Sequence, residues 1–338
     1  MGNDAKATVS KATVVTQLVI SQGQACNFTG LTEGASIGIS MEVVTDSIGS
    51  GAADQIKYLT SLDEAYVVTC KEGTLYLAAP VAEADSKAYG SVNDALVNTT
   101  SYVKLTADVT EDVEITGDAY LDLNGHTLTG NITGAGTLYG MDSTTDSYTA
   151  DNMGRITGSV SCKVAGSFNT DITGNVRRYM AISDDTGYTF HRFYMGITHI
   201  SLKPGVTGVG YKAVFYGDEQ VLSQVTGYGY TLWVGAEGKK VSAGKEGAFI
   251  SGKTVTARLQ NFDVAAYGEA PIYGQVYLTL KDGTTVESAA YSYTLRNLVE
   301  QVAANTGSYT ESQLSALRDM LLRFESTVSG WKVENLLG

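Results

Sequence analysis

Four aspartates recur at short intervals in one stretch of the chain, where acidic side chains could act on a sugar. They are Asp108, Asp112, Asp118 and Asp122. Glycosidases and polysaccharide lyases place acids across a sugar ring, and such carboxylates can also bind Ca²⁺. The apolar strands around these aspartates are short, and basic residues beside them are few. We therefore predict carboxylates in solvated turns, with no catalytic residue, no cofactor and at most a weak Ca²⁺ site.

Three aromatic residues, Tyr228, Tyr230 and Trp233, form the second candidate site. Flat aromatic rings stack on sugar rings, and the tyrosine hydroxyl adds a polar group. Strand alternation places Tyr228 and Tyr230 on one face and Trp233 on the other, so one of the two sets is expected in the core. These three residues are our predicted glycan-binding residues, with packing in the core as the alternative.

Two short motifs match catalytic or nucleotide-binding patterns by letter alone. Residues 247–254 fit the phosphate-binding loop, and residues 34–38 fit the nucleophile elbow around Ser36. Each pattern needs a helix directly after it. Here residues 255–259 and the residues after Ser36 alternate as strands, so we predict neither nucleotide binding nor a catalytic serine.

Histidine and cysteine offer no metal-binding pattern. His191 and His199 lie too far apart on one strand to bind one ion together, and His126, beside a turn, is expected to hydrogen-bond a neighbouring coil. The three cysteines are Cys26, Cys70 and Cys162. They lack the close pairs of a zinc site, so we predict free thiols, with a Cys26–Cys70 disulfide as the alternative.

The overall charge bears on the choice of partner. The chain of 338 residues carries 36 acidic against 23 basic side chains, a formal charge of -13. Such a surface repels phosphate backbones, so we predict no nucleic-acid partner. No apolar run approaches the roughly 20 residues that span a bilayer, so we predict no membrane insertion. Residues 1–4 lack signal-peptide features, so either the protein is not exported or the chain begins after such a segment.

The elements that must position these residues are mostly strands. The 38 glycines, 21 tyrosines and three prolines are typical of many strands joined by tight turns. Residues 1–88 show period-two alternation and predict an N-terminal β domain, with a hairpin around residues 71–73. Residues 89–175 begin with a short helix at 92–97, for which Ser91 is the expected N-cap.

Very short strands between tiny turns follow this helix. Their rapid recurrence predicts a short parallel β-solenoid in residues 89–175, in which each coil buries one face against the next. Its inward residues are predicted to be Leu121, Leu123, Leu128, Ile132 and Leu138, and its outward ones Asp122, Thr127 and Thr129.

Strands lengthen from residue 176. Seven of them up to residue 292 predict an antiparallel β-sandwich. Residues 293–338 predict a helical hairpin packed on the sandwich, because apolar residues recur at helical spacing in both of its segments. Ser308 with Glu311 fits a capping box for the second helix. The predicted fold class is therefore mainly β: an N-terminal β domain, a short parallel solenoid, an antiparallel sandwich and a C-terminal helical hairpin.

Residues 121–130 (LDLNGHTLTG), 188–198 and 208–213 resemble segments of large surface proteins of Gram-positive gut anaerobes. In that group the first segment is similar to coils of β-helical adhesin-like regions. The other two, with the helical tail after Tyr293, look like a recurrent C-terminal module. The resemblance covers roughly residues 89–325, leaves residues 1–88 unmatched and transfers no catalytic residue. It implies an extracellular location, either secreted or at the cell surface.

Together these observations predict a non-catalytic structural or adhesive module of a bacterial cell-surface or secreted protein. Its expected partner is a glycan or protein on a host or bacterial surface. A carbohydrate-active enzyme built on the solenoid is the first alternative, because the aspartates lie there. A phage or viral structural protein is the second alternative.

Overall fold

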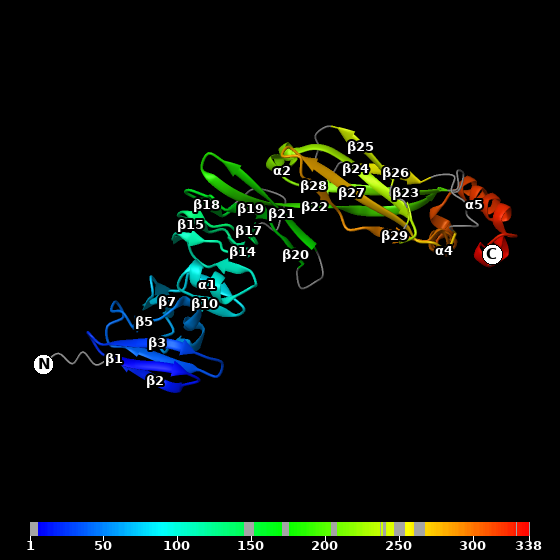
Figure 1. Ribbon diagram of the computed structural model, residues 1–338. Helices are drawn as coiled ribbons and strands as arrows, with labels where there is room; N and C mark the ends of the chain where they lie inside the picture. The colour runs from blue at the N-terminus through cyan, green and yellow to red at the C-terminus, as the bar shows by residue number, and fades with distance from the viewer. Residues whose placement is uncertain are drawn as a thin grey trace. The chain divides into compact units, whose positions relative to one another are not determined.

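The computed structural model describes most of the chain. The described residues are 6–144, 152–170, 176–203, 208–236, 238, 241–246, 254–259, 268–328 and 330–337. Strands dominate, and the chain divides into two compact units, Met1–Arg192 and Phe193–Gly338. The prediction of a mainly β fold is confirmed. Each unit is described by itself below, with the elements labelled as in Figure 1.

Parallel strands stack along the first unit from its beginning. One side starts with β1 (Lys6–Lys11), β3 (Ala25–Leu31) and β5 (Gly49–Ser50), and another with β2 (Val14–Ile20), β4 (Ser36–Met41) and β6 (Leu59–Ser61). Val14 pairs with Ser36 and Ile37 with Leu59 in parallel register, one coil apart. The solenoid therefore begins inside residues 1–88, earlier than predicted. Strand alternation did not reveal this, because it does not distinguish parallel from antiparallel neighbours.

A hairpin and a helix interrupt the stacked strands. The hairpin joins β7 (Val67–Lys71) to β8 (Thr74–Ala78) and turns at Glu72 and Gly73, both with positive φ, so the predicted turn is confirmed. A second pair, β9 (Ala82–Ala84) with β10 (Lys87–Tyr89), leads into helix α1 (Val92–Asn98). The predicted N-cap is confirmed as well, because the Asp94 N–H donates to the Ser91 hydroxyl at 2.9 Å.

The later coils have three short sides each. The first side holds β11 (Val103–Leu105), β14 (Ala119–Asp122), β17 (Thr137–Met141) and β19 (Lys163–Gly166); the second holds β12 (Val109–Thr110), β15 (Thr127–Thr129) and β18 (Arg155–Thr157); the third holds β13 (Val113–Glu114) and β16 (Ile132–Thr133). All of these neighbours pair in parallel, as in Val103↔Leu121 and Val109↔Leu128. The predicted parallel solenoid is confirmed, and it has about six turns.

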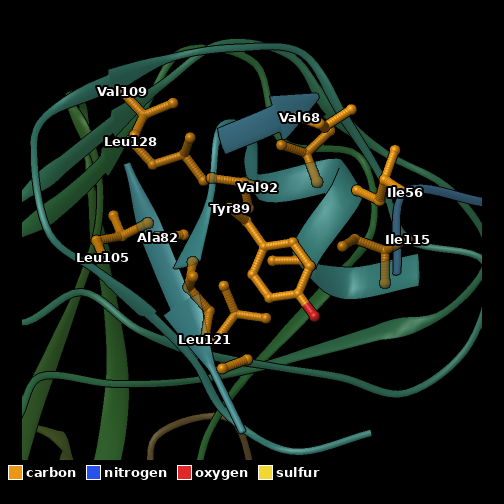
Figure 2. Packing of buried hydrophobic residues seen from close by; sticks show 14 of the residues in the cluster. Ile56, Val68, Ala82, Tyr89, Val92, Leu105, Val109, Ile115, Leu121 and Leu128 are labelled. Atoms are coloured by element: carbon orange, nitrogen blue, oxygen red, sulfur yellow. The ribbon is translucent and has the colours of Figure 1, made fainter. Parts of the chain in front are cut away.

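A single hydrophobic cluster fills the solenoid from Ile20 to Phe190. Figure 2 shows Leu105 from one coil and Leu121 and Leu128 from the next coil, in the cluster that also contains Tyr89. The five residues predicted to point inward, Leu121, Leu123, Leu128, Ile132 and Leu138, are each at most 1% exposed. That part of the prediction is confirmed.

Asp122 was predicted to lie outside, and this is wrong, because its side chain is only 3% exposed. Alternation does turn it away from its buried neighbour Leu121. The strand ends at this point, however, and two turns fold over the carboxylate. Asp122 Oδ1 accepts hydrogen bonds from the Asn124 N–H at 3.0 Å and the Ser143 N–H at 2.9 Å. Thr129 is exposed and Thr127 half-buried.

Two more strands, β20 (Phe168–Thr170) and β21 (Val176–Asp184), pair with each other in antiparallel register and lie within the first unit. Strand β22 (Gly187–Lys203) begins there, where Tyr188 pairs with Ile156 of β18. Gly140 shows why the end of the core needs small residues, because a Cβ there would lie 1.9 Å from the Phe190 ring.

In the part of the second unit that the structure describes, the long strands form two antiparallel sheets. One contains β22, β23 (Gly208–Tyr216) and β26 (Thr254–Leu259); the other contains β24 (Val225–Val234), β25 (Val241–Glu246), β27 (Ile272–Leu280), β28 (Thr285–Glu287) and β29 (Tyr291–Tyr293). The Tyr211 hydroxyl on β23 donates to the Ile272 carbonyl on β27. Its ring also fills the space where Gly274 lacks a side chain. The sheets therefore face each other, as a sandwich requires.

Helices close the second unit. They are α2 (Glu219–Gln224) between the strands, then α4 (Leu295–Ala304), α5 (Glu311–Phe324) and the short α6 (Val333–Leu336). The predicted apolar stripes are buried on both long helices. The capping box of α5 is Thr310 with Gln313, two residues later than predicted, because residues Thr306–Ser308 form a 3-10 turn of their own.

Candidate functional site

The predicted aromatic site lies on β24 of the second unit. Tyr228 is 9% and Trp233 8% exposed, and Tyr230 is half-buried. The Trp233 ring stacks on Tyr273 with ring centres 5.1 Å apart and planes 6° apart. One face of the indole is thus already covered by a tyrosine. Tyr230 presents the most accessible of the three rings, and glycan binding by these residues remains a prediction.

Three tyrosines on the solenoid form a second aromatic surface that sequence reasoning missed. We call Tyr102, Tyr120 and Tyr139 the tyrosine row. Tyr120 pairs with Tyr139 across β14 and β17, and their ring centres lie 5.3 Å apart with planes 17° apart. Tyr102, one residue before β11, meets Tyr120 edge-on at 5.3 Å. The sequence signal was a tyrosine directly beside an inward apolar residue in three successive coils.

The core of the solenoid fixes this row. Each tyrosine precedes or follows a fully buried residue, such as Val103, Leu121 or Leu138, so strand alternation turns the phenol ring outward. All three tyrosines are half-buried, because their rings cover one another. Each tyrosine therefore keeps part of its surface accessible. The row is therefore a pre-arranged aromatic surface on a packed scaffold.

Charged side chains flank the row on the same sheet. Lys104 Nζ lies 3.8 Å from Glu83 Oε1, and their side chains are 40% and 52% exposed. On the other side of the row, Thr137 pairs with Lys163. Exposed cationic and carboxylate groups beside aromatic rings are suited to hydrogen-bond hydroxyl groups.

The exposed aspartates connect one coil to the next. Asp108 Oδ1 accepts a hydrogen bond from the Thr127 N–H at 2.8 Å, and Asp112 Oδ1 accepts one from the Asn131 N–H at 2.8 Å. The hydrogen bonds from Asn131 lower the pKa of Asp112. Asp118 is exposed. These positions agree with turn carboxylates that satisfy backbone N–H groups of the adjoining coil.

Two buried aspartates close the corner that follows β14 and β17. Asp142 is fully buried, and its Oδ1 accepts from the Gly125 N–H at 3.1 Å while its Oδ2 accepts from the Gly154 N–H at 2.5 Å. Burial raises the pKa of Asp122, hydrogen bonds from Ser143 and Asn124 oppose this, and the nearby Asp142 charge adds to the rise. Backbone N–H groups occupy these carboxylates, so the corner has the chemistry of a structural clamp.

A third buried carboxylate belongs to helix α1. Asp94 is 1% exposed, and its Oδ2 accepts from the Thr69 hydroxyl at 2.6 Å and from the Cys70 N–H at 2.8 Å. Asp94 Oδ1 and Asn98 Oδ1 are buried and have no hydrogen-bond partner in the described part of the chain. Burial raises the pKa of Asp94. The carboxylate joins α1 to β7.

The alternative disulfide between Cys26 and Cys70 is wrong, because all three cysteines are free thiols. Cys26 on β3 and Cys70 on β7 are separated in one sheet by β5 and β8. Three strand spacings amount to about 14 Å, twice the Cα separation that a disulfide tolerates. Burial raises the pKa of both thiols. Among the residues with described positions, no group of three or more His, Cys, Asp and Glu side chains is arranged to hold a metal ion.

The remaining motifs behave as predicted where they are described. Ser36 begins strand β4, and Thr254–Leu259 is strand β26, so neither motif leads into a helix. Residues 247–253 of the loop-like motif lie outside the described residues. His126 Nδ1 lies 3.5 Å from Asp108 Oδ1 of the preceding coil, and the buried His191 Nε2 lies 2.8 Å from the Thr189 hydroxyl.

Comparison with known proteins adds no family. No protein-family model matches the chain, and no curated protein matches it either. Across the described residues, no helix is both long enough and apolar enough to cross a membrane.

Proposed function

We propose that this chain is a non-catalytic adhesive module of a bacterial cell-surface or secreted protein, and that the tyrosine row binds a surface glycan. The observation that carries the proposal is the row itself, with Tyr120 and Tyr139 stacked 5.3 Å apart on the outer side of a packed sheet. A rigid aromatic surface loses little conformational freedom when a ligand binds.

Sugar chemistry suits this surface. A pyranose ring has apolar C–H faces and polar edges, so it needs aromatic rings beside hydrogen-bonding side chains. The tyrosine row provides the rings, while Lys104 and Glu83 provide exposed charged groups. The acidic chain, with its formal charge of -13, favours neutral glycans over phosphate-bearing partners.

The test is a glycan array probed with the labelled full chain. We expect retention on a subset of glycans that share a terminal hexose. Retention on none of them would overturn the proposed function. A second experiment separates binding from catalysis. A glycan that the array retains is incubated with the chain, and a shortened glycan product would favour the carbohydrate-active enzyme.

A further inference from the structure

The tyrosine row ends at Tyr139. This ring has a single ring neighbour among the described residues, Tyr120, whereas Tyr120 has two. The next strand in the sheet is β19, and the residue that pairs with Tyr139 there is Ala165. The row therefore stops because a methyl group stands where a fourth ring would continue it.

The missing ring has a definite place. Neighbouring strands lie about 4.8 Å apart, so a ring at position 165 would stack on Tyr139 much as Tyr139 stacks on Tyr120. Tyr139 and Ala165 are both only partly buried. Along the sheet toward β19, the Tyr139 ring thus adjoins a methyl group in the position of a fourth ring.

Polar side chains lie beside this place. Thr137 and Lys163 are two residues earlier on β17 and β19, pair with each other, and share the outer face with Tyr139 and Ala165 because strand side chains alternate. Lys163 is exposed and Thr137 is half-buried. An ammonium and a hydroxyl group can therefore hydrogen-bond the rim of a ring seated over Ala165.

We propose that a neutral hexopyranose ring stacks on Tyr139 over Ala165, in the position of a fourth ring, with its hydroxyl groups bound by Lys163 and Thr137. Galactose is a suitable probe, because its axial 4-hydroxyl leaves one continuous face of C–H groups for stacking. This inference rests on the proposed glycan-binding function and names the subsite for its terminal sugar.

Ala165→Tyr tests the subsite directly. The added ring should complete the row and occupy the place of the sugar. Methyl β-galactoside is titrated into the full chain and followed by NMR. We expect wild-type binding, at least tenfold weaker binding for Ala165→Tyr and Tyr139→Leu, and wild-type affinity for Tyr309→Leu, a matched change at an exposed tyrosine of the second unit.

Thermal unfolding shows whether each variant keeps its fold. If Ala165→Tyr does not fold, Tyr139→Leu tests the subsite in its place. Wild-type affinity in a folded Ala165→Tyr or Tyr139→Leu chain would overturn the subsite. Failure of wild type to bind methyl β-galactoside would also overturn it. The glycan array distinguishes failure of the subsite from failure of the proposed function. If the array retains the wild type and both variants equally, the chain binds glycans at another surface and only the subsite is wrong.

Discussion

For individual aspartates, the burial seen in the structure differs from the exposure that the residue type predicts. Asp122 follows a buried leucine at the end of a strand, a position that sequence patterns assign to solvent. In the structure its carboxylate is buried and binds the Asn124 and Ser143 N–H groups. The partner Ser143 comes from the next coil, so no local pattern could have indicated it. The inward leucines, by contrast, follow directly from alternation.

Leu123 and Asp122 therefore both stabilise the solenoid, the leucine by apolar burial and the aspartate by hydrogen bonds. Leu123→Ala should lower the free energy of unfolding by about 2–5 kcal/mol, because the leucine is fully buried. Asp122→Ala should cost about 1–3 kcal/mol, because two partly buried N–H groups lose their acceptor. Urea denaturation measures both. Asp122→Asn is the matched control, since its amide oxygen can still accept, and a loss equal to that of Asp122→Ala would contradict this explanation.

Asp94 makes stability depend on pH. Its folded-state pKa is raised above the ordinary value of 3.8, chiefly by burial, so the folded state holds this proton more tightly than the unfolded chain. The resulting stabilisation is present below that ordinary value and is lost as pH rises through the raised pKa. Asn98 Oδ1 has no hydrogen-bond partner among the residues that the structure describes. A proton on Asp94 Oδ1 would also give it a donor one helical turn away.

Asp94→Asn should remove this dependence. Its amide can donate to Asn98 at every pH, so urea midpoints measured from pH 4 upward should fall for the wild type relative to the variant. Parallel curves for the two proteins over that range would show that Asp94 is not the group responsible.

At the scale of elements, the sequence predicts the existence of the C-terminal helices more accurately than the residues at which they begin and end. The stripes on α4 and α5 were predictable because apolar residues recur at helical spacing. The burial of Trp331 was not, since a lone tryptophan after a helix carries no periodic signal. In the structure Trp331 is fully buried, with the Arg296 guanidinium 5.9 Å from its ring centre. Arg296 also forms an ion pair with Glu269 at 2.5 Å.

Trp331 should therefore anchor the tail to its unit. Trp331→Ala is expected to lower the free energy of unfolding by about 3–5 kcal/mol, as for other buried aromatic residues. Leu322→Ala on the exposed side of α5, where the leucine is 59% exposed, should change it by no more than about 0.5 kcal/mol. Chemical denaturation compares the two. Deleting residues 308–338 should lower the melting temperature, and an unchanged value would mean that the tail is not part of this unit's core.

At the scale of the whole molecule, the sequence predicted the type of each element more reliably than which elements pair with one another. It indicated strands throughout and stacked coils where those strands are short. It missed the coils within residues 6–61, because longer strands with simple alternation suit many sheets. The sequence did not predict the tyrosine row either. Tyr102, Tyr120 and Tyr139 come together only through the register of successive coils, which the sequence pattern does not give.

The measurement that tests the tyrosine row most directly is glycan retention by Tyr120→Leu beside Tyr309→Leu. Tyr120 is the middle ring and contacts both other members of the row, whereas Tyr309 is an exposed tyrosine of the second unit. We expect a folded Tyr120→Leu chain to lose at least nine-tenths of its retention on the glycans that the wild type binds, and Tyr309→Leu to keep it. Equal retention by the two variants would contradict the assignment of the tyrosine row as the binding surface.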